Sequence, residues 1–385
     1  MDFSRRLPAD LSPSPLAVEL SQIRDAVDLT AANPTLAGLA VPDLAMRLAA
    51  DNAGLYHPDP RGLLSARRAV VDYAAFVGLA LATDRLLITA STSEAYGLLL
   101  KLLCNPGDKI AAPSPSYPLV DVLAGLELVE VVRYELTCAD RWRVDVESVA
   151  AALHAGARAV IVVQPNNPTG SCASPQEIVA LDELCAAHDA AIISDEVFRV
   201  FPMGPVPLMS LAGERLSLTF VLDGLSKSAA LPQLKLGWLA AFGPSARVAA
   251  AMSRLEWISD AYLSVATPVQ LALPALLEGA PKMQRQICER VRLNREVLAG
   301  ALGLVPAVEL LTAEGGWYAV LRVPAVGSED ELVLRLAHDA RVIVHPGYFY
   351  DFAHDGYLVL GLIAPPQVFE VAVRRLARVL AEICG

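Results

Sequence analysis

Apolar residues recur along this chain in two patterns, and each pattern predicts a kind of secondary structure. The stretch 61–79 has apolar residues at positions i, i+3, i+4 and i+7, which is the spacing of one helical face. Short, nearly continuous apolar runs at 86–90 and 159–163 have the length of buried strands. Ser174 and Glu177 form a capping-box pattern that is typical of a helix start. Because such strands and helices alternate, we predict an α/β fold with a mostly parallel sheet covered by helices on both faces.

The pattern changes after residue 246. A long helical stretch runs to about residue 300, and strand-like segments at 315–323 and 356–364 then mix with further helices. This mixture is typical of an α+β unit. We therefore predict two domains. The large α/β domain would comprise residues 46–285, and a smaller α+β domain would combine residues 1–45 with 286–385.

The composition excludes several classes of protein. The 385 residues are 54% hydrophobic and 19% charged, which is too apolar for a disordered chain. The net charge of −11 argues against a nucleic-acid partner or an anionic membrane. The apolar runs are far shorter than the roughly 18 residues of a spanning helix, and the N-terminus lacks a signal-peptide pattern. The six cysteines have no metal-ligand spacing, so we expect a cytoplasmic protein with reduced thiols and no metal site.

Lysine is rare in this chain, which has 26 arginines and only five lysines. Lys227 directly follows an apolar strand and is flanked by small polar residues. A lysine at the carboxyl end of a strand, in a pocket that lowers its pKa, is suited to Schiff-base chemistry. A surface lysine on a turn is an equally good interpretation of the local sequence.

Two other polar segments follow apolar strands. Asp195 follows the run AAII, and Asn167 lies in the string PNNPTG. An acid at the carboxyl end of a central parallel strand lies where open α/β sheets bind ligands, although a helix cap or a plain loop would give the same local pattern. Asn167, Asp195 and Lys227 are separated by 28 and 32 residues, and each interval fits one strand–helix unit. We therefore expect all three side chains at one edge of the sheet.

Taken in order, the motifs PNNPTG, SDEVF and GLSK resemble those of the pyridoxal-phosphate-dependent aminotransferases of fold type I, the class I/II (aspartate aminotransferase-like) family. The resemblance covers nearly the whole chain. It implies that pyridoxal 5′-phosphate is the cofactor, and that an amino group passes from an amino-acid or amine donor to a keto acid by a ping-pong mechanism. Lys227 would hold the cofactor as a Schiff base and move the proton at the substrate Cα. Asp195 would pair with the pyridine nitrogen, and Asn167 would hydrogen-bond the 3′ oxygen.

The same resemblance assigns further residues to the cofactor. Thr92 and Ser93, in STSEA at a helix start, would bind the phosphate together with Ser226. Tyr117 would stack on the pyridine ring. Tyr56 would reach the phosphate of the neighbouring subunit, which implies a homodimer with shared active sites.

Three positions depart from the family pattern. Phe198 stands where the family usually has a tyrosine that hydrogen-bonds the 3′ oxygen, and Lys235 stands where it usually has a phosphate-binding arginine. Val359 replaces the arginine that binds the substrate α-carboxylate. Three explanations remain open. The carboxylate is held by other groups, such as backbone donors near Asn33 or the side chain of Arg322; or the substrate lacks an α-carboxylate; or the reaction is no longer amino-acid transamination.

Two aromatic segments could line the substrate site. Trp317, in GGWY, and Tyr348, in GYFYD, would provide apolar walls that favour apolar or amine-bearing donors, although core packing explains them equally well. A second enzymatic interpretation is another reaction of the same cofactor, namely that of a C–S β-lyase, a decarboxylase or an amino-acid oxidase or deaminase. The effector-binding half of a gene regulator would need a DNA-binding segment, which this sequence does not offer.

Overall fold

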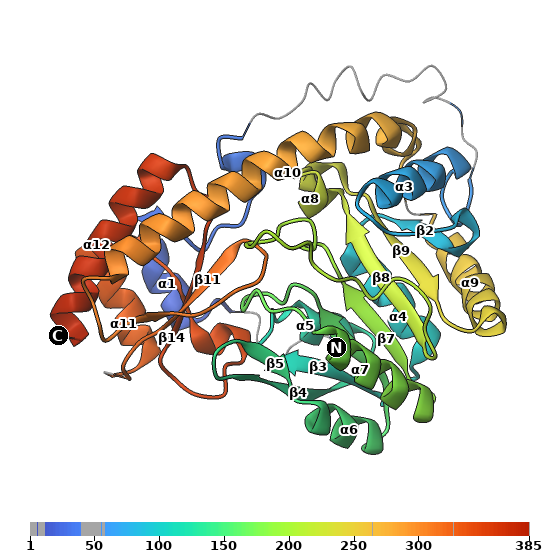
Figure 1. The fold of residues 1–385 in the computed structure, drawn as a ribbon, viewed down its shortest axis with the longest axis horizontal. Helices are drawn as coiled ribbons and strands as arrows, with labels where there is room; N and C mark the ends of the chain where they lie inside the picture. Colours follow the sequence, from blue (N-terminus) through green and yellow to red (C-terminus); the bar gives the residue numbers. More distant parts are fainter. Residues whose placement is uncertain are drawn as a thin grey trace, which may run out of the picture.

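Two sheets organise the molecule, one of eight strands and one of four (Figure 1). They are seen in a computed structural model that describes residues 6, 12–39, 55, 58–263, 265–325 and 327–384. The eight-stranded sheet lies at the centre right of Figure 1, and the four-stranded sheet lies at the left, beside the C-terminal helices.

The large sheet is parallel in its middle and antiparallel at both sides. Its strands in spatial order are β2 (Leu86–Thr89), β9 (Gly237–Phe242), β8 (Leu218–Gly224), β7 (Ala191–Asp195), β6 (Ala157–Val163), β3 (Lys109–Ser114), β4 (Glu130–Cys138) and β5 (Trp142–Val144). The five strands from β8 to β4 run parallel, whereas β9, β2 and β5 pair with their neighbours antiparallel. The predicted fold class, an α/β fold with a mostly parallel sheet, is therefore confirmed.

Alternate residues of the central strands enter two different apolar cores. Ile161 and Ile193 belong to one core with Leu99, whereas Val160 belongs to the other with Leu181. Because both faces are buried, the strands read as continuous apolar runs instead of alternating ones. The covering helices are α3 (Leu64–Phe76), α4 (Thr92–Leu103), α5 (Leu119–Leu126), α6 (Val146–His154), α7 (Pro175–Ala187) and α9 (Ser245–Asp260). The capping box predicted at Ser174 is present at the start of α7.

The small sheet is antiparallel and has a separate two-stranded sheet beside it. Its order is β10 (Glu309–Leu310), β11 (Tyr318–Arg322), β14 (Tyr357–Gly361) and β13 (His345–Pro346). Next to it, β1 (Val27–Asp28) pairs in parallel with β12 (Val342–Ile343). The helices of this part are α1 (Pro15–Ser21), α11 (Glu329–Arg335) and α12 (Pro366–Cys384), with short helical turns at η4 (Leu336–Ala340) and η5 (Gly347–Tyr350).

One long helix connects the two parts. Helix α10 (Thr267–Leu302) has 36 residues and packs against α3 at one end of the molecule and α12 at the other (Figure 1). The single helical stretch expected from 246 to about 300 is thus interrupted at 261–266. The predicted domain boundary at 285 falls inside α10. The division of the chain into two domains stays a prediction.

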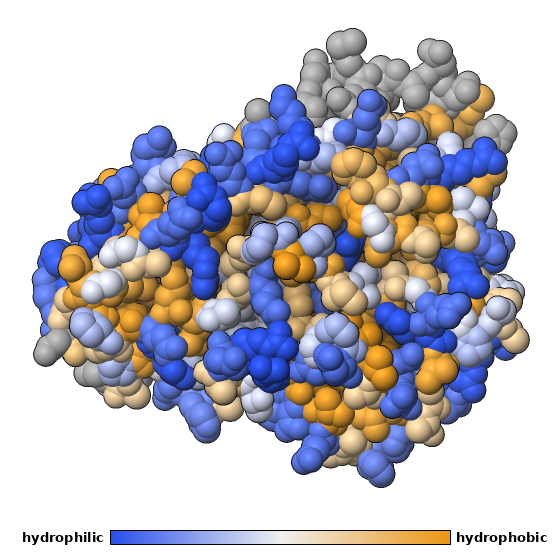
Figure 2. Space-filling view, in the orientation of Figure 1, coloured by the Kyte–Doolittle hydropathy of each residue, from blue (hydrophilic) through white to orange (hydrophobic). Residues whose placement is uncertain are grey.

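In Figure 2, hydrophilic residues cover much of the outer surface along α10 and α12. Within the described ranges, no helix is both long and apolar enough to cross a membrane.

Candidate active site

The polar residues that follow β6, β7 and β8 meet at one edge of the large sheet. These strands are parallel neighbours, and Asp195 is level with Val163 on one side and Leu222 on the other. Asn167 follows the end of β6, and Lys227 follows the end of β8. The carboxyl ends of parallel strands open onto the same crevice. The structure therefore brings Asn167, Asp195 and Lys227 together at the predicted edge.

Lys227 lies on a short helix, α8 (Leu225–Ser228), between two aromatic rings. Its Nζ atom is 5.1 Å from the centroid of Trp317 and 5.5 Å from that of Phe198. Burial lowers the pKa of Lys227, and the nearby Asp195 carboxylate acts in the opposite direction. The lowered pKa increases the fraction of neutral amine, the form that attacks a carbonyl carbon.

A buried carboxyl group fixes the helix that carries Lys227. The Oδ1 atom of Asp223 accepts hydrogen bonds of 2.6 Å from the backbone N–H of Gly224 and the hydroxyl of Ser228. Burial raises the pKa of Asp223 to about 7. Gln284 of α10 also donates to the Ser228 carbonyl, at 2.7 Å. Helix α8 is therefore held from the large sheet and from the long connecting helix.

Asp195 is held by a tyrosine that the sequence reasoning missed. The hydroxyl of Tyr96 donates to Oδ2 of Asp195 at 3.3 Å, and the N–H of Val197 donates to Oδ1 at 3.3 Å. Burial raises the pKa of Asp195 to about 6. Tyr96 lies four residues after Thr92 on α4, so the helical period places it one turn further along the helix. That spacing is the signal from which Tyr96 could have been found.

Asn167 combines near-complete burial with unused hydrogen-bonding capacity. Its side chain faces the hydroxyl of Tyr318, and the hydrogen bond it makes lowers the pKa of that tyrosine against the larger effect of burial, which raises it. The Oδ1 atom of Asn167 is buried and has no hydrogen-bond partner. Buried polar atoms in native proteins are nearly always paired. One end of this amide is therefore available to a bound molecule.

The start of α4 lies near this edge and presents free backbone N–H groups. The side chain of Ser91 caps the helix by accepting from the N–H of Glu94, and the Glu94 carboxylate accepts from the N–H of Ala90 at 2.6 Å. Thr92 and Ser93 are the first two residues of the helix, where backbone N–H groups have no partner within the helix. Such N–H groups, with the helix dipole, favour a phosphate or carboxylate.

Gly237 of β9 lies directly beneath that helix start. A Cβ atom at this position would be 3.1 Å from the backbone carbon of Ser91 and 3.2 Å from the nitrogen of Thr92. Any side chain here would displace the first turn of α4. Ser226 precedes Lys227 on α8 and is half-buried. Lys235 is exposed and ends the turn η3 (Pro232–Leu234) in the left-handed conformation, with φ of 50°.

The remaining predicted residues fall into two groups, those with aromatic neighbours near the crevice and those whose side chains bond to other parts of the molecule. Tyr117 is 43% exposed and its ring lies 6.3 Å from that of Tyr350, while Trp317 is fully buried against Lys227. Other side chains have partners elsewhere. Asn33 is exposed and accepts from the N–H of Thr35, Tyr348 donates its hydroxyl to Asp330 at 2.8 Å, and Arg322 forms an ion pair with Glu309. Tyr56 lies outside the described residues.

Val359 lies in the middle of the small sheet. It is fully buried and pairs directly with Val320 of β11 on one side and His345 of β13 on the other. The side chains of directly paired residues point to the same face of a sheet. The position where the family carries a carboxylate-binding arginine therefore has an apolar and an imidazole neighbour.

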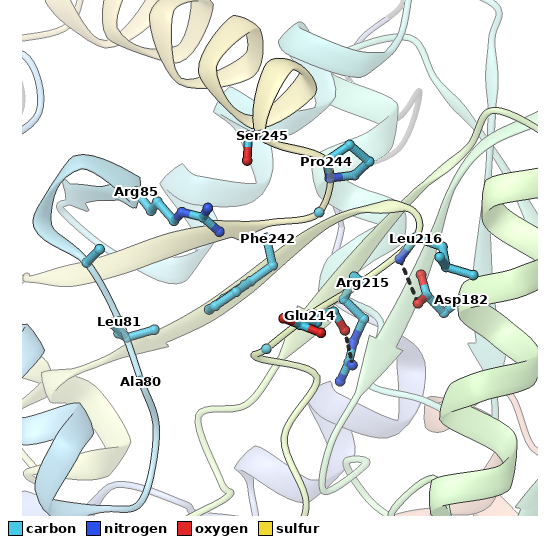
Figure 3. Close-up of a pocket in the computed structure, with 13 residues that line it drawn as sticks. Ala80, Leu81, Arg85, Asp182, Glu214, Arg215, Leu216, Phe242, Pro244 and Ser245 are labelled. Carbon is cyan, nitrogen blue, oxygen red and sulfur yellow. Dashed lines mark hydrogen bonds between the residues drawn. The ribbon is translucent and has the colours of Figure 1, made fainter.

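A cavity of about 780 Å³ lies at the other edge of the large sheet (Figure 3). It is lined by residues such as Leu216, which precedes β8, and Phe242, which ends the antiparallel β9. Since Lys227 follows the opposite end of β8, this cavity is separate from the crevice described above. Of its two acidic residues, Asp182 accepts a hydrogen bond from the backbone N–H of Leu216 at 2.9 Å, and Glu214 is the other. In the part of the chain that is described, no group of three or more histidine, cysteine or acidic residues is placed to hold a metal.

Comparison with known proteins gives one consistent family. The model of the family "aminotransferase class I and II" matches residues 24–367. An alanine aminotransferase of Mycobacterium tuberculosis is 27% identical over 367 residues, which cover 92% of this chain and 85% of that protein. An arginine–pyruvate transaminase of Pseudomonas aeruginosa is 28% identical, covering 86% of this chain and 84% of that protein. The solved alanine aminotransferase from Pyrococcus furiosus has the same fold, with a TM-score of 0.87 at 22% identity over 95% of this chain and 96% of that one.

Proposed function

Because this chain belongs to the aminotransferases of class I and II, whose cofactor is pyridoxal 5′-phosphate, we propose that Lys227, Asp195 and Asn167 form its active site. Membership of the family confirms the resemblance seen in the three sequence motifs. The observation that carries the assignment is the convergence of these side chains at the carboxyl ends of β8, β7 and β6. Asp195 and Lys227 lie close enough for each to affect the ionisation of the other.

The residues at this edge fit the cofactor. Asn167 has a buried amide oxygen without a partner, which would meet the polar substituent of the ring. The N–H groups of Thr92 and Ser93 would bind its phosphate, with Ser226 beside Lys227 as a further donor. Gly237 leaves the space that this helix start needs. Tyr117, which is partly exposed, would cover one face of the ring.

Each residue then has a physical task. When bound, pyridoxal 5′-phosphate withdraws electrons from the substrate Cα. Asp195 would accept a hydrogen bond from the ring nitrogen and keep it protonated, and the Tyr96 hydroxyl would keep the Asp195 carboxylate in place. Lys227 would move the proton at Cα, because burial lowers the pKa of its amine and leaves more of it neutral. Trp317 and Phe198 would restrict water around that amine.

We infer that pyruvate is the keto acid and that small apolar amino acids such as alanine are good donors. The names of two relatives, an alanine aminotransferase and an arginine–pyruvate transaminase, support this choice. The side chains around Lys227 support it as well, since Trp317 and Phe198 are apolar walls. A ping-pong sequence follows from it, with the donor leaving as a keto acid before the acceptor binds.

We also infer that the chain works as a homodimer. Three large apolar side chains at the end of α9 and the loop after it are unusually exposed: Trp257 at 79%, Tyr262 at 52% and Leu263 at 62%. Leu263 lines a small cavity together with residues 58–60, so this apolar surface adjoins the segment that follows Tyr56. Exposed apolar patches of this kind mark contact surfaces. A second copy seated there would cover the apolar surface beside residues 58–60.

A half-reaction tests the proposed function. The purified protein, saturated with pyridoxal 5′-phosphate, is mixed with L-alanine in the absence of a keto acid. We expect the visible absorbance of the bound cofactor to disappear while one equivalent of pyruvate per chain, and no ammonia, is released. Release of ammonia in step with pyruvate would contradict transamination, because an aminotransferase keeps the nitrogen until an acceptor arrives.

A further inference from the structure

The face of the small sheet around Val359 carries two buried tyrosines and no free cation among the described residues. Tyr318 and Val320 alternate along β11, so Tyr318 shares a face with Val359, which is directly paired with Val320. Arg322 lies two positions beyond Val320, where it is ion-paired with Glu309 and largely exposed. Burial lowers the pKa of His345, against the opposing effect of Asp28, and so disfavours the charged form of its imidazole.

Tyr318 reaches from that face to the cofactor edge. Its ring packs edge-on against Phe198, with centroids 6.2 Å apart at an angle of 89°. The Asn167 side chain is close enough to its hydroxyl to lower the pKa of Tyr318 against the larger effect of burial. Phe198 in turn contacts the Nζ of Lys227. Tyr318 therefore links the face of the small sheet that carries Val359 to the aromatic ring beside the reactive lysine.

Tyr350 brings a second hydroxyl to the same place from a different segment. It is 1% exposed, at the end of η5, and its backbone carbonyl accepts from the N–H of Ser116 at 2.8 Å. The imidazole of His345 packs against it, with ring centroids 5.7 Å apart. Burial raises the pKa of Tyr350, and the hydroxyls of Tyr318 and Tyr117 raise it further. The Tyr350 hydroxyl makes no hydrogen bond to another residue in the described part of the chain.

We propose that the hydroxyls of Tyr318 and Tyr350 bind the carboxylate of the amino-acid substrate, in place of a cationic side chain at Val359. This inference rests on the proposed function, since it deepens the substrate site of the same reaction. Both phenols stay protonated at neutral pH and so can donate to a carboxylate. Asn167 orients the first hydroxyl, and the His345 ring positions the second.

A neutral site of this kind has a consequence for specificity. Two separate hydroxyl donors bind a carboxylate less strongly than the fork of an arginine does. A buried arginine would be left with an unpaired charge when an amine without a carboxylate binds, whereas two neutral hydroxyls would not. The enzyme should therefore prefer amino acids over plain amines only moderately, and it should accept both.

Two measurements on the holoenzyme test the proposal. The first is the affinity for propionate, a carboxylate that cannot react, measured by calorimetric titration. The second is the rate of the half-reaction with L-alanine relative to 2-aminopropane, which carries a methyl group in place of the carboxylate. Y318F and Y350F should each weaken propionate binding and lower the rate ratio by roughly tenfold, the loss expected for one hydrogen bond to a charged group. Both variants remove one oxygen only, and retained visible absorbance of bound cofactor shows that they are folded.

The matched control is Y357F. Tyr357 lies on the same strand as Val359 but stacks on Phe352, with centroids 4.3 Å apart, and should leave both measurements unchanged. Wild-type values for propionate binding and for the rate ratio in both Y318F and Y350F would overturn the proposal, as would an equal loss in Y357F. A holoenzyme that does not react with alanine would refute the proposed function alone, because the propionate titration would still show whether the two hydroxyls bind a carboxylate.

Discussion

The Nζ atom of Lys227 lies 5.1 Å from the centroid of the Trp317 ring. Lys227 follows the last parallel strand of the large sheet, whereas Trp317 directly precedes β11 of the small sheet. The environment of the reactive amine is thus built by both parts of the molecule. Substitutions in either part should change the chemistry at Lys227, and the following predictions use residues from both.

Adding a hydroxyl at Phe198 should change the ionisation of the bound cofactor. In F198Y the new donor would lie next to Lys227 and Asn167 and would hydrogen-bond the cofactor's 3′ oxygen. Such a bond favours the deprotonated form, so the pH midpoint of the cofactor's visible absorbance should fall by about one unit. The measurement is a spectroscopic pH titration of wild type and variant. An unchanged or higher midpoint would mean that position 198 does not face this oxygen.

Filling the space at Gly237 should weaken cofactor binding. In G237A the new methyl group would lie about 3.1–3.2 Å from backbone atoms of Ser91 and Thr92, which cannot rotate away. The first turn of α4 would shift, and the affinity for pyridoxal 5′-phosphate should fall by about tenfold, the size of a 1–2 kcal/mol overpacking penalty. Fluorescence titration of the apoprotein measures this affinity. The control is G125A on α5, where nothing lies within 4 Å of the added carbon. Equal affinities in the two variants would count against a phosphate site at Thr92.

The buried Asp223 should make the apoprotein less stable at high pH. Its pKa in the fold, about 7, is above the roughly 3.9 of an unfolded aspartate. The folded state therefore binds more protons between these values, and this contribution to stability is full below pH 4 and is lost as the pH rises through 7. The wild type should lose about 2–3 kcal/mol between pH 5 and pH 8 from this group.

The variant D223N isolates that effect. An amide keeps an acceptor for Gly224 and Ser228 but does not ionise, so the variant should lose less stability than the wild type between pH 5 and pH 8. Urea unfolding of both apoproteins at the two pH values gives the comparison. If D223N and wild type lose the same free energy of unfolding across this interval, Asp223 does not titrate there.

If two copies associate through the surface at the end of α9, a charge added there should weaken the dimer, and a charge added elsewhere should not. Trp257 and Leu304 are both large and exposed, at 79% and 83%, but Trp257 lies on α9, six residues before Leu263, whereas Leu304 follows the end of α10. W257D should shift the protein toward the monomer in light scattering at micromolar concentration, and L304D should not. A wild type that is monomeric with active cofactor bound would refute the shared active site.

The edge position of Asn167, Asp195 and Lys227 could be predicted because each follows an apolar strand by only a few residues. In a parallel sheet, that distance along the chain determines the place in space. The direction of β9 could not be predicted in the same way. A strand buried on both faces has the same apolar run whether it is parallel or antiparallel to its neighbour.

The contacts of Tyr318 and Tyr350 could not be predicted from the sequence either, and the spacing that places Tyr96 one turn after Thr92 does not identify Asp195 as its partner. Tyr96 meets Asp195 across 99 positions, and Tyr318 meets Asn167 from the other sheet. Such pairs depend on how separate elements pack, and hydrophobic periodicity within one element carries no information about them. The break between α9 and α10 did have a signal, which the sequence reasoning missed: Pro268 is the second residue of α10, a position where proline is typical of a helix start.

The central claim is that Lys227 holds the cofactor and carries out the transfer. Borohydride reduction of the holoenzyme, followed by mass spectrometry of its peptides, tests it most directly, with K227A and K235A as the paired variants. We predict that the reduced cofactor is found on Lys227 alone, that K235A retains this modification, and that K227A loses both the modification and the half-reaction with alanine. Recovery of the reduced cofactor on another lysine, or alanine turnover by K227A at the wild-type rate, would contradict the account.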